Sequence, residues 1–197
     1  MLIGLCGGSG SGKGAVSKIL CEIGIPTIDT DAVYHDLTSR PTECLDELVG
    51  EFGEGIIKDS ALDRAALRDI VFKEGQDPLL HKRLGEITYK HIIKEALGIA
   101  ESYFDSGAKD VVIDAPMLFE AGLDSLCDKL ICVVADKDVR VERIIARDGI
   151  SREKALSRIA HQLDDKCLIA RCDAVIYNNG DLKQLKDGVL RALKSIY

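Results

Sequence analysis

The segment that most constrains this chain is a glycine-rich loop near its N-terminus. Residues 7–14 are GGSGSGKG and match the spacing G-x-x-x-x-G-K, with Lys13 at the lysine position. An apolar run at residues 2–6 precedes the loop and predicts a buried strand, and a helical pattern begins at Ala15. In this context the spacing indicates a phosphate-binding loop, because backbone N–H groups at a helix N-terminus converge on phosphate oxygens. A plain glycine-rich turn is the alternative, and the strand and Lys13 argue against it.

The last position of the loop departs from the usual pattern. Gly14 stands where Ser or Thr is normal, and the hydroxyl of that residue usually coordinates Mg²⁺. We therefore expect a site for a polyphosphate and Mg²⁺ in which Lys13 contacts the β- and γ-phosphates. Water is expected to replace the missing hydroxyl as a metal ligand, helped by Asp31 or Asp114.

Length, charge and cysteine content limit the classes of function. The chain has 197 residues and a net charge of −7, which predicts one compact domain and argues against nucleic-acid or membrane-surface partners. No apolar run is long enough to cross a bilayer. Seven cysteines without a C-x-x-C motif, and no N-terminal secretory segment, predict free thiols in the cytoplasm. The Cys127/Cys132 and Cys167/Cys172 pairs have the wrong spacing for zinc and are expected to be buried small hydrophobes.

The rest of the chain alternates between strand and helix patterns. Short apolar runs predict buried parallel strands at residues 2–6, 111–114, 130–134 and 174–177, with a shorter one at 25–28. Amphipathic stretches between them complete an α/β sandwich. Between Asp29 and Lys109 the pattern is helical, with no convincing strand, and this insertion is expected to determine specificity. Its expected inner faces are Leu62, Leu67, Ile70 and Val71, and Leu84, Ile87 and His91.

Acidic residues follow two of the predicted strands. Asp29-Thr30-Asp31 lies at the carboxyl edge of the sheet, where α/β proteins bind ligands, and Asp31 is the favoured base for an attacking hydroxyl. An alternative of equal weight is that Thr30 or Asp31 caps a helix over residues 32–37. Asp114 ends another strand and is predicted to hold Mg²⁺ through water, with a turn or cap role as the alternative.

A basic stretch follows the predicted strand at residues 130–134. Residues 140–171 hold eight Arg or Lys against five Asp or Glu, although the whole chain is acidic. Arg140, Arg143 and Arg147 are spaced to share one helix face. A solvated surface is the alternative, but planar guanidinium groups suit phosphoryl oxygens and stabilise the charge that develops during phosphoryl transfer. Residues 147–166 are predicted to form a helical lid.

Several motifs, taken in order, resemble those of the dephospho-coenzyme A (dephospho-CoA) kinases over nearly the whole chain. The most specific are Asp-Ala-Pro-Met-Leu-Phe-Glu at residues 114–120, Phe-Gly at 52–53 with Leu-Asp-Arg at 62–64, and Asn-Asn-Gly at 178–180. Ile-Asp-Thr-Asp at 28–31 also matches. The phosphate loop alone indicates only the superfamily of P-loop kinases.

The resemblance implies a single α/β P-loop kinase domain over residues 1–197, with a five-stranded parallel sheet. The core would be residues 1–29, 108–140 and 172–197, with a helical CoA-binding insertion at about 30–107 and a lid at about 141–171. It also implies that ATP phosphorylates the ribose 3′-hydroxyl of dephospho-CoA, the last step of CoA biosynthesis, in the cytoplasm.

The resemblance also implies roles for single residues. The residues expected to bind ATP are Gly10, Ser11, Gly12, Lys13, Gly14 and Ala15, and Asn179 is expected to lie near the adenine pocket. Asp31 aligns with the base, Arg143 and Arg147 with the lid arginines, and Asp31 and Asp114 are the candidates for Mg²⁺. The departures from the family pattern are Gly14, Ala15 where Thr is common, Thr88-Tyr89-Lys90 in place of a His-Pro pair, Arg140 for Gln and Cys172 for Ala.

Two alternatives to this function stay open from the sequence. One is a P-loop kinase for another small acceptor, such as a nucleoside monophosphate or a sugar acid. The other is a nucleotide-dependent regulatory switch, which the lack of an N-K-x-D-type tetrapeptide and the basic lid disfavour. The oligomeric state is not predicted.

Overall fold

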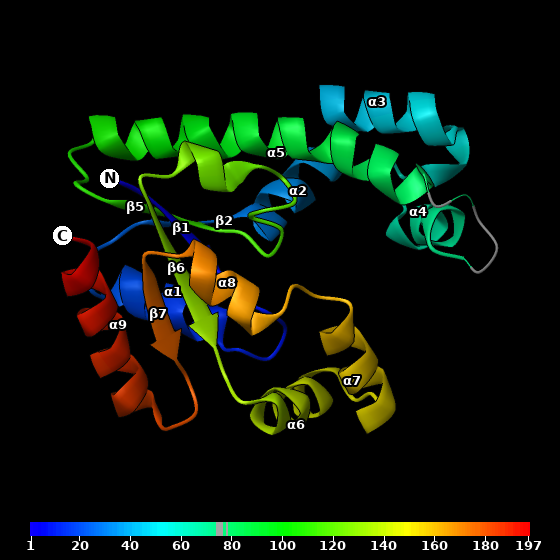
Figure 1. Cartoon of the computed structure of the whole chain (residues 1–197). Coiled ribbons are helices and arrows are strands. Elements are labelled where there is room, and N and C mark those ends of the chain that lie inside the picture. The colour runs from blue at the N-terminus through cyan, green and yellow to red at the C-terminus, as the bar shows by residue number, and fades with distance from the viewer. Residues whose placement is uncertain (74–76, 78) are drawn as a thin grey trace. The chain divides into compact units, whose positions relative to one another are not determined.

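The protein is described by a computed structural model over residues 1–73, 77 and 79–197. The chain divides into two compact units (Figure 1). Unit 1 comprises Met1–Ile28 and Ser102–Tyr197 and contains most of a five-stranded sheet, and unit 2, Asp29–Glu101, is mainly helical. Within the described residues, no helix has the length and apolar character needed to span a membrane.

The sheet has the strand order β2-β5-β1-β6-β7. Its strands are β1 (Leu2–Cys6), β2 (Thr27–Asp29), β5 (Val111–Asp114), β6 (Lys129–Val134) and β7 (Ala174–Tyr177). Strand β1 pairs in parallel with β5 and β6, and β6 pairs in parallel with β7. All five residues of β1 are buried, as expected for a central strand covered on both faces. The predicted α/β fold with a five-stranded parallel sheet is confirmed.

Two strand boundaries differ from the predictions for physical reasons. Strand β2 begins at Thr27, not at residue 25, because Pro26 has no N–H to donate, although its carbonyl accepts from Val112 N at 2.8 Å. Strand β6 begins at Lys129, one residue early, because Lys129 already lies opposite Ile3 in the register.

Two helices cover one face of the sheet. These are α1 (Lys13–Glu22), which follows the phosphate loop, and the C-terminal helix α9 (Leu182–Ile196), which lies beside β7. Ile3 and Leu5 of β1 point into this layer with Val16 of α1 and Val189 of α9, all nearly inaccessible to solvent. Because side chains alternate along a strand, Gly4 and Cys6 point to the other face.

The basic stretch forms three helices. They are α6 (Lys137–Asp148), α7 (Arg152–Ala160) and α8 (Asp165–Arg171). The predicted helical lid is therefore interrupted: Gly149 ends α6 with φ of 64°, and the side chain of Ser151 caps α7. Val141, Ile144 and Ala155 are buried between α6 and α7, and α8 packs on β6.

Unit 2 contains a hairpin that the sequence analysis missed. Its helices are α2 (Thr30–Thr38), α3 (Glu43–Phe52), α4 (Arg64–Val71) and most of α5 (Leu79–Asp105). Between α3 and α4 lie a 3-10 turn (Glu54–Ile56) and the strands β3 (Ile57–Lys58) and β4 (Ala61–Leu62). Leu62, predicted on a helix face, is thus in a strand. The turn residues Asp59 and Ser60 have φ of 51° and 63°, as a tight hairpin requires, but without the usual glycine.

The expected inner faces of unit 2 are only partly buried. Leu67 and Val71 are buried in α4, whereas Leu84, Ile87 and His91 of α5 are only half-buried. The fully buried positions of α5 that the structure describes are Thr88, Ala96 and Ala100. Helix α5 therefore packs mainly through small side chains, which hydrophobic periodicity does not emphasise.

Candidate active site

The phosphate loop is held in shape by contacts that leave no space for a side chain at Gly10 or Gly12. Gly12, with φ of 92°, precedes the first turn of α1, and a Cβ there would lie 2.0 Å from Asn178 Nδ2. Asn178 is buried at the end of β7 and donates from Nδ2 to the Ser11 carbonyl at 2.7 Å. Gly10, with φ of 78°, sits against the backbone of Arg140. Both positions therefore require glycine.

Lys13 belongs to a buried polar group at the end of the sheet. Its ammonium pairs with the Asp114 carboxylate, and Ser17, one turn further along α1, donates its hydroxyl to the same carboxylate. The Lys13 and Asp114 side chains are 15% and 7% exposed, so both charges are largely removed from water. This arrangement brings together the two charged residues that the sequence analysis placed near the phosphates. It adds Ser17, which that analysis did not assign.

The open side of the loop lies at Gly14. A Cβ at Gly14 would meet nothing within 4 Å, so packing does not exclude a larger residue there. Two other residues of the predicted ATP-binding segment differ in their hydrogen bonding. The hydroxyl of Ser11 is buried and has no hydrogen-bond partner in the part of the chain that the structure describes. Ala15 donates its N–H to the Gly12 carbonyl within the first turn of α1.

Arg140 of α6 is hydrogen-bonded to the phosphate loop. It is 4% exposed, and its Nε donates to the Ser9 carbonyl at 2.9 Å while Nη1 pairs with Asp165 at 2.9 Å. Its Nη2 donates to Gln162 Oε1, which also accepts from Ser9 N at 2.9 Å. Arg140 is therefore a structural link between the phosphate loop, α6 and α8. It is not placed to act as a phosphate ligand, because each of its three side-chain nitrogens already donates a hydrogen bond within the protein.

The other two arginines of α6 lie in different surroundings. Arg143 Nη1 donates to the carbonyls of Gly10 and Ser11 at 3.3 and 3.4 Å, which places this guanidinium against the loop. Arg147 is 60% exposed and forms a bidentate pair with Asp148. Hydrogen bonds from Arg147 and Arg158 lower the pKa of Asp148 to about 2, so this carboxylate stays charged at neutral pH.

Asp29, and not Thr30 or Asp31, caps helix α2. Asp29 accepts from the backbone N–H groups of Asp31 and Ala32 at 2.9 and 3.4 Å, and the helix begins at Thr30. The cap alternative is therefore wrong for Asp31, whose side chain lies in the first turn of α2. The structure places Asp31 in unit 2 and the phosphate loop in unit 1.

Asn179 and its neighbour Asn178 follow β7 and hold two other segments, while the place of Asn179 near the adenine stays a prediction. The side-chain oxygen of Asn179 accepts from Asp136 N at 2.7 Å, so it fixes the chain just before α6. Asn178, which the sequence analysis did not single out, makes the contact with the phosphate loop. The signal that could have found it is a polar residue directly after a buried strand.

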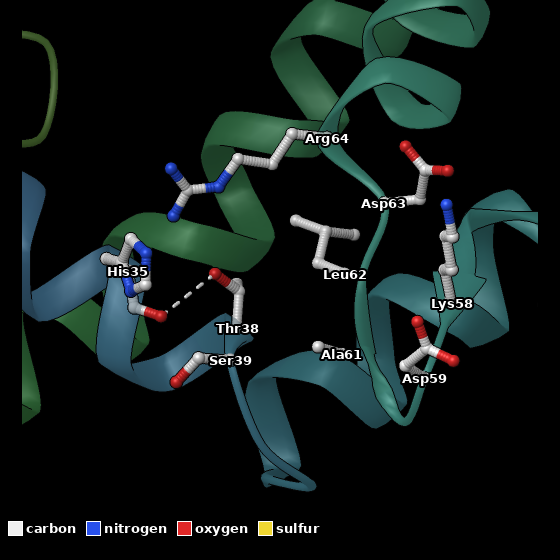
Figure 2. A pocket seen from close by; sticks show the side chains of 9 residues that line it. All are labelled: His35, Thr38, Ser39, Lys58, Asp59, Ala61, Leu62, Asp63 and Arg64. Atoms are coloured by element: carbon white, nitrogen blue, oxygen red, sulfur yellow. Dashed lines mark hydrogen bonds between the residues drawn. The ribbon is translucent and has the colours of Figure 1, made fainter.

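Unit 2 has a pocket of its own (Figure 2). It has a volume of about 590 Å³ and is lined by residues of α2, the hairpin and α4: His35, Thr38, Ser39, Lys58, Asp59, Ala61, Leu62, Asp63 and Arg64. The guanidinium of Arg64 lies 5.7 Å from the centre of the Tyr34 ring, and in Figure 2 it extends toward His35. Asp63 is engaged as the cap of α4, so its charge is partly compensated by N–H groups.

Comparison with known proteins decides the family. Residues 1–184 match the family model described as dephospho-CoA kinase. The chain belongs to the dephospho-CoA kinase family. Proteins named dephospho-CoA kinase from Fusobacterium nucleatum and Geobacillus kaustophilus are 37% and 36% identical to it, over 100% and 98% of this chain and 98% and 96% of theirs.

Solved structures show the same fold. A crystal structure from Thermus thermophilus matches with a TM-score of 0.81 at 30% identity, covering 99% of this chain and 96% of that one. Shikimate kinase from Bacteroides thetaiotaomicron matches with a TM-score of 0.58 at 16% identity, covering 98% and 97%. The second likeness shows a shared P-loop kinase fold only.

One departure from the dephospho-CoA kinase pattern has a structural account. Lys90, in the segment that replaces the usual His-Pro pair, forms an ion pair with Glu47. His91 Nε2 lies 3.2 Å from the same carboxylate. Hydrogen bonds from Lys90 and then His91 lower the pKa of Glu47. This segment therefore links α5 to α3 within unit 2.

The two glycines of the loop offer a matched pair of substitutions. Gly12→Ala is expected to lower the free energy of unfolding by about 1–3 kcal/mol, because it forces a positive φ and displaces Asn178. Gly14→Ala, two residues away, is expected to raise it by up to about 1 kcal/mol, because alanine favours the helix and meets no neighbour. Urea unfolding of both variants measures this. Equal effects of the two substitutions would contradict the geometry described for Gly12 and Asn178.

Proposed function

We propose that this chain transfers the γ-phosphoryl group of ATP to the ribose 3′-hydroxyl of dephospho-CoA, giving CoA and ADP. The observation that carries the proposal is the family match over residues 1–184, because it covers the phosphate loop and all of unit 2. A kinase for a nucleoside monophosphate or a sugar acid, and a regulatory switch, are not favoured by that match. The reaction is the final step of CoA biosynthesis.

The residues at the phosphate loop supply electrostatic stabilisation. The N–H groups of the loop and of the first turn of α1 would bind phosphate oxygens, and Lys13 would exchange part of its contact with Asp114 for the β- and γ-phosphates. Arg143 already lies against the loop and is the nearest lid cation for charge that develops on the γ-phosphoryl. Arg147, whose side chain is 60% exposed, would act by exchanging its bidentate pair with Asp148 for phosphate oxygens.

Asp114 and Ser17 are the residues that would hold Mg²⁺ in unit 1. They offer a carboxylate and a hydroxyl, the oxygen donors that Mg²⁺ prefers together with water and nucleotide phosphates. Within the described residues no set of three His, Cys, Asp or Glu is arranged as a metal site, so most ligands would be phosphate and water. When bound, the metal would neutralise charge on the β- and γ-phosphates. Ser17 thus supplies a hydroxyl beside Asp114 that Gly14 cannot.

Asp31 is proposed as the general base. It lies in the first turn of α2, and Asp29 rather than Asp31 provides the cap, so the Asp31 carboxylate is not needed to begin the helix. In the reaction it would accept the proton of the 3′-hydroxyl as the new P–O bond forms.

The pocket of unit 2 is proposed to bind the acceptor. Its volume suits a small-molecule site, and Arg64 and Lys58 provide cations for the phosphate groups of dephospho-CoA. Arg64 is the better candidate, because a guanidinium can bind phosphate through two parallel hydrogen bonds.

An acceptor panel tests the proposed function. The protein is incubated with ATP and, separately, dephospho-CoA, AMP, shikimate, gluconate or no acceptor, and the products are identified by mass. We expect one added phosphoryl group on dephospho-CoA and little ADP in its absence. Transfer mainly to another acceptor, or ADP formation that no acceptor stimulates, would contradict the proposal.

Asparagine variants distinguish the two carboxylates beside β2. Asp31→Asn is expected to lower kcat by about 10²- to 10⁴-fold with little change in KM for ATP, because it removes the base and keeps the shape. Asp29→Asn is the matched control, since asparagine caps helices as well as aspartate does. A large loss of kcat in Asp29→Asn with a nearly normal Asp31→Asn would overturn the assignment.

Metal binding tests the role of Ser17. Ser17→Ala is expected to weaken Mn²⁺ binding to the ADP complex by about tenfold, measured by electron paramagnetic resonance, because one partner of Asp114 is lost. Ser17→Thr, which keeps the hydroxyl, serves as the control, and Gly14→Ser in the Ser17→Ala background is expected to restore part of the affinity. Unchanged Mn²⁺ affinity in Ser17→Ala would remove Ser17 from the metal site.

A further inference from the structure

Three cysteines lie together on the face of the sheet opposite α1 and α9. Cys6 ends β1 directly before the phosphate loop, and its register partner on β6 is Cys132. Both alternate with residues that face α1 and α9, namely Leu5 and Ile131, so the two thiols point to the other face. Cys172 directly follows α8, which packs on β6, and its Sγ lies 3.7 Å from Cys6 Sγ.

The three thiols differ in acidity and in access to solvent. Hydrogen bonds from the Cys132 and Cys6 thiols lower the pKa of Cys172. The thiol pKa values of Cys6 and Cys132 are raised, first by their hydrogen bonds to Cys172 and then by burial. Cys172 is half-buried, whereas Cys6 and Cys132 are buried. The thiol that ionises first is thus also the one that a small oxidant can reach, and the thiolate is the reactive form of cysteine. The prediction of a buried small hydrophobe is confirmed for Cys132 and wrong for Cys167, which is exposed.

We propose that Cys172 is an oxidation site for small peroxides and that it forms a reversible disulfide with Cys6. The Cys172 thiolate attacks one peroxide oxygen, the O–O bond breaks, and the sulfenic acid and hydroxide are formed, the latter being protonated to water. The Cys6 thiol then attacks the sulfenic sulfur, which forms the S–S bond and releases a second water. Two thiols are oxidised and one peroxide is reduced.

The 3.7 Å separation of the Cys6 and Cys172 sulfurs makes Cys6 a suitable partner. A disulfide has an S–S distance of about 2.05 Å, so the two sulfurs must approach by less than 2 Å, which side-chain rotation can provide. Cys6 and Cys172 are far apart in sequence, so the bond would connect two distant segments of the chain.

The disulfide would connect two segments of the site. Cys6 is followed at once by Gly7 of the phosphate loop, and Cys172 ends the stretch of α6, α7 and α8 whose Arg140 and Gln162 contact that loop. The bond would fix the end of this stretch to the strand that carries the loop. We expect slower turnover in the oxidised protein; this part rests on the proposed function, whereas formation of the bond does not.

The test is peroxide treatment of the full chain, with the bond located by mass spectrometry of peptides after free thiols are alkylated. The expected result is a Cys6–Cys172 linked peptide, the loss of two hydrogen masses, and full reversal by dithiothreitol. Cys167→Ser, an exposed thiol on α8, is the matched control and should form the bond at the normal rate. Cys172→Ala should abolish it and keep the activity of the reduced protein.

The possible outcomes separate the two claims. Free, alkylated Cys6 and Cys172 after treatment, or a Cys132–Cys172 bond in place of the predicted one, would overturn the proposed site. A correct disulfide with turnover unchanged would overturn the proposed effect on the loop. Absence of kinase activity in the reduced protein would instead be a failure of the proposed function. Peptide mapping of the unsubstituted chain decides the site even if Cys172→Ala does not fold.

Discussion

The buried ion pair between Lys13 and Asp114 is the interaction on which the candidate site depends. It joins the first residue of α1 to the last residue of β5, across the end of β1. Two charges this far from water are tolerated only when each is well paired, and Ser17 adds a hydrogen bond to the carboxylate. The same pair keeps the Lys13 ammonium beside the phosphate loop. In the proposed reaction, this ammonium would bind the phosphate group, which offers more oxygens than the Asp114 carboxylate does.

The loop itself is shaped by residues distant in sequence. Asn178 holds it from the end of β7, Arg140 holds it from α6, and Arg143 contacts its carbonyl oxygens. These donors bind carbonyl oxygens of the loop and so do not occupy its N–H groups, although Ser9 N–H donates to Gln162 Oε1 and Ser11 N–H to the Gly8 carbonyl. A glycine is required where Asn178 approaches Gly12, whereas Gly14 is open. The missing hydroxyl at Gly14 is therefore not a consequence of crowding.

Much of this could be predicted because it is local in sequence. The phosphate loop, Lys13 and Asp114 follow from short motifs, and the strands of the parallel sheet follow from apolar runs with turn residues at their ends. Family membership followed from motifs spread along the chain. Each of these signals comes from residues that are neighbours in sequence, or from the order of short motifs along the chain.

Other features depend on spatial relations that no spacing encodes. The spacing of Arg140, Arg143 and Arg147 predicts a shared helix face, but it does not predict the groups that each side chain contacts. Arg140, whose role is structural, therefore resembled a phosphate ligand. Ser17 was missed because its role depends on Asp114, on a strand far along the chain. The hairpin was missed because Asp59 and Ser60 adopt positive φ without glycine. Asp29 is the N-cap because it directly precedes the first helical residue, and its side-chain oxygen accepts from two N–H groups of the first turn.

The most direct test of the central claim is a double-mutant cycle on Lys13 and Asp114, measured by urea unfolding without nucleotide. Lys13→Met alone should lower the free energy of unfolding by about 3 kcal/mol, because it leaves Asp114 buried without its cation. Adding Asp114→Asn should recover a large part of that loss, with a coupling energy of about 1–3 kcal/mol, while ATP binding stays weak. Effects that add to within about 0.5 kcal/mol would show that the pair does not organise the site.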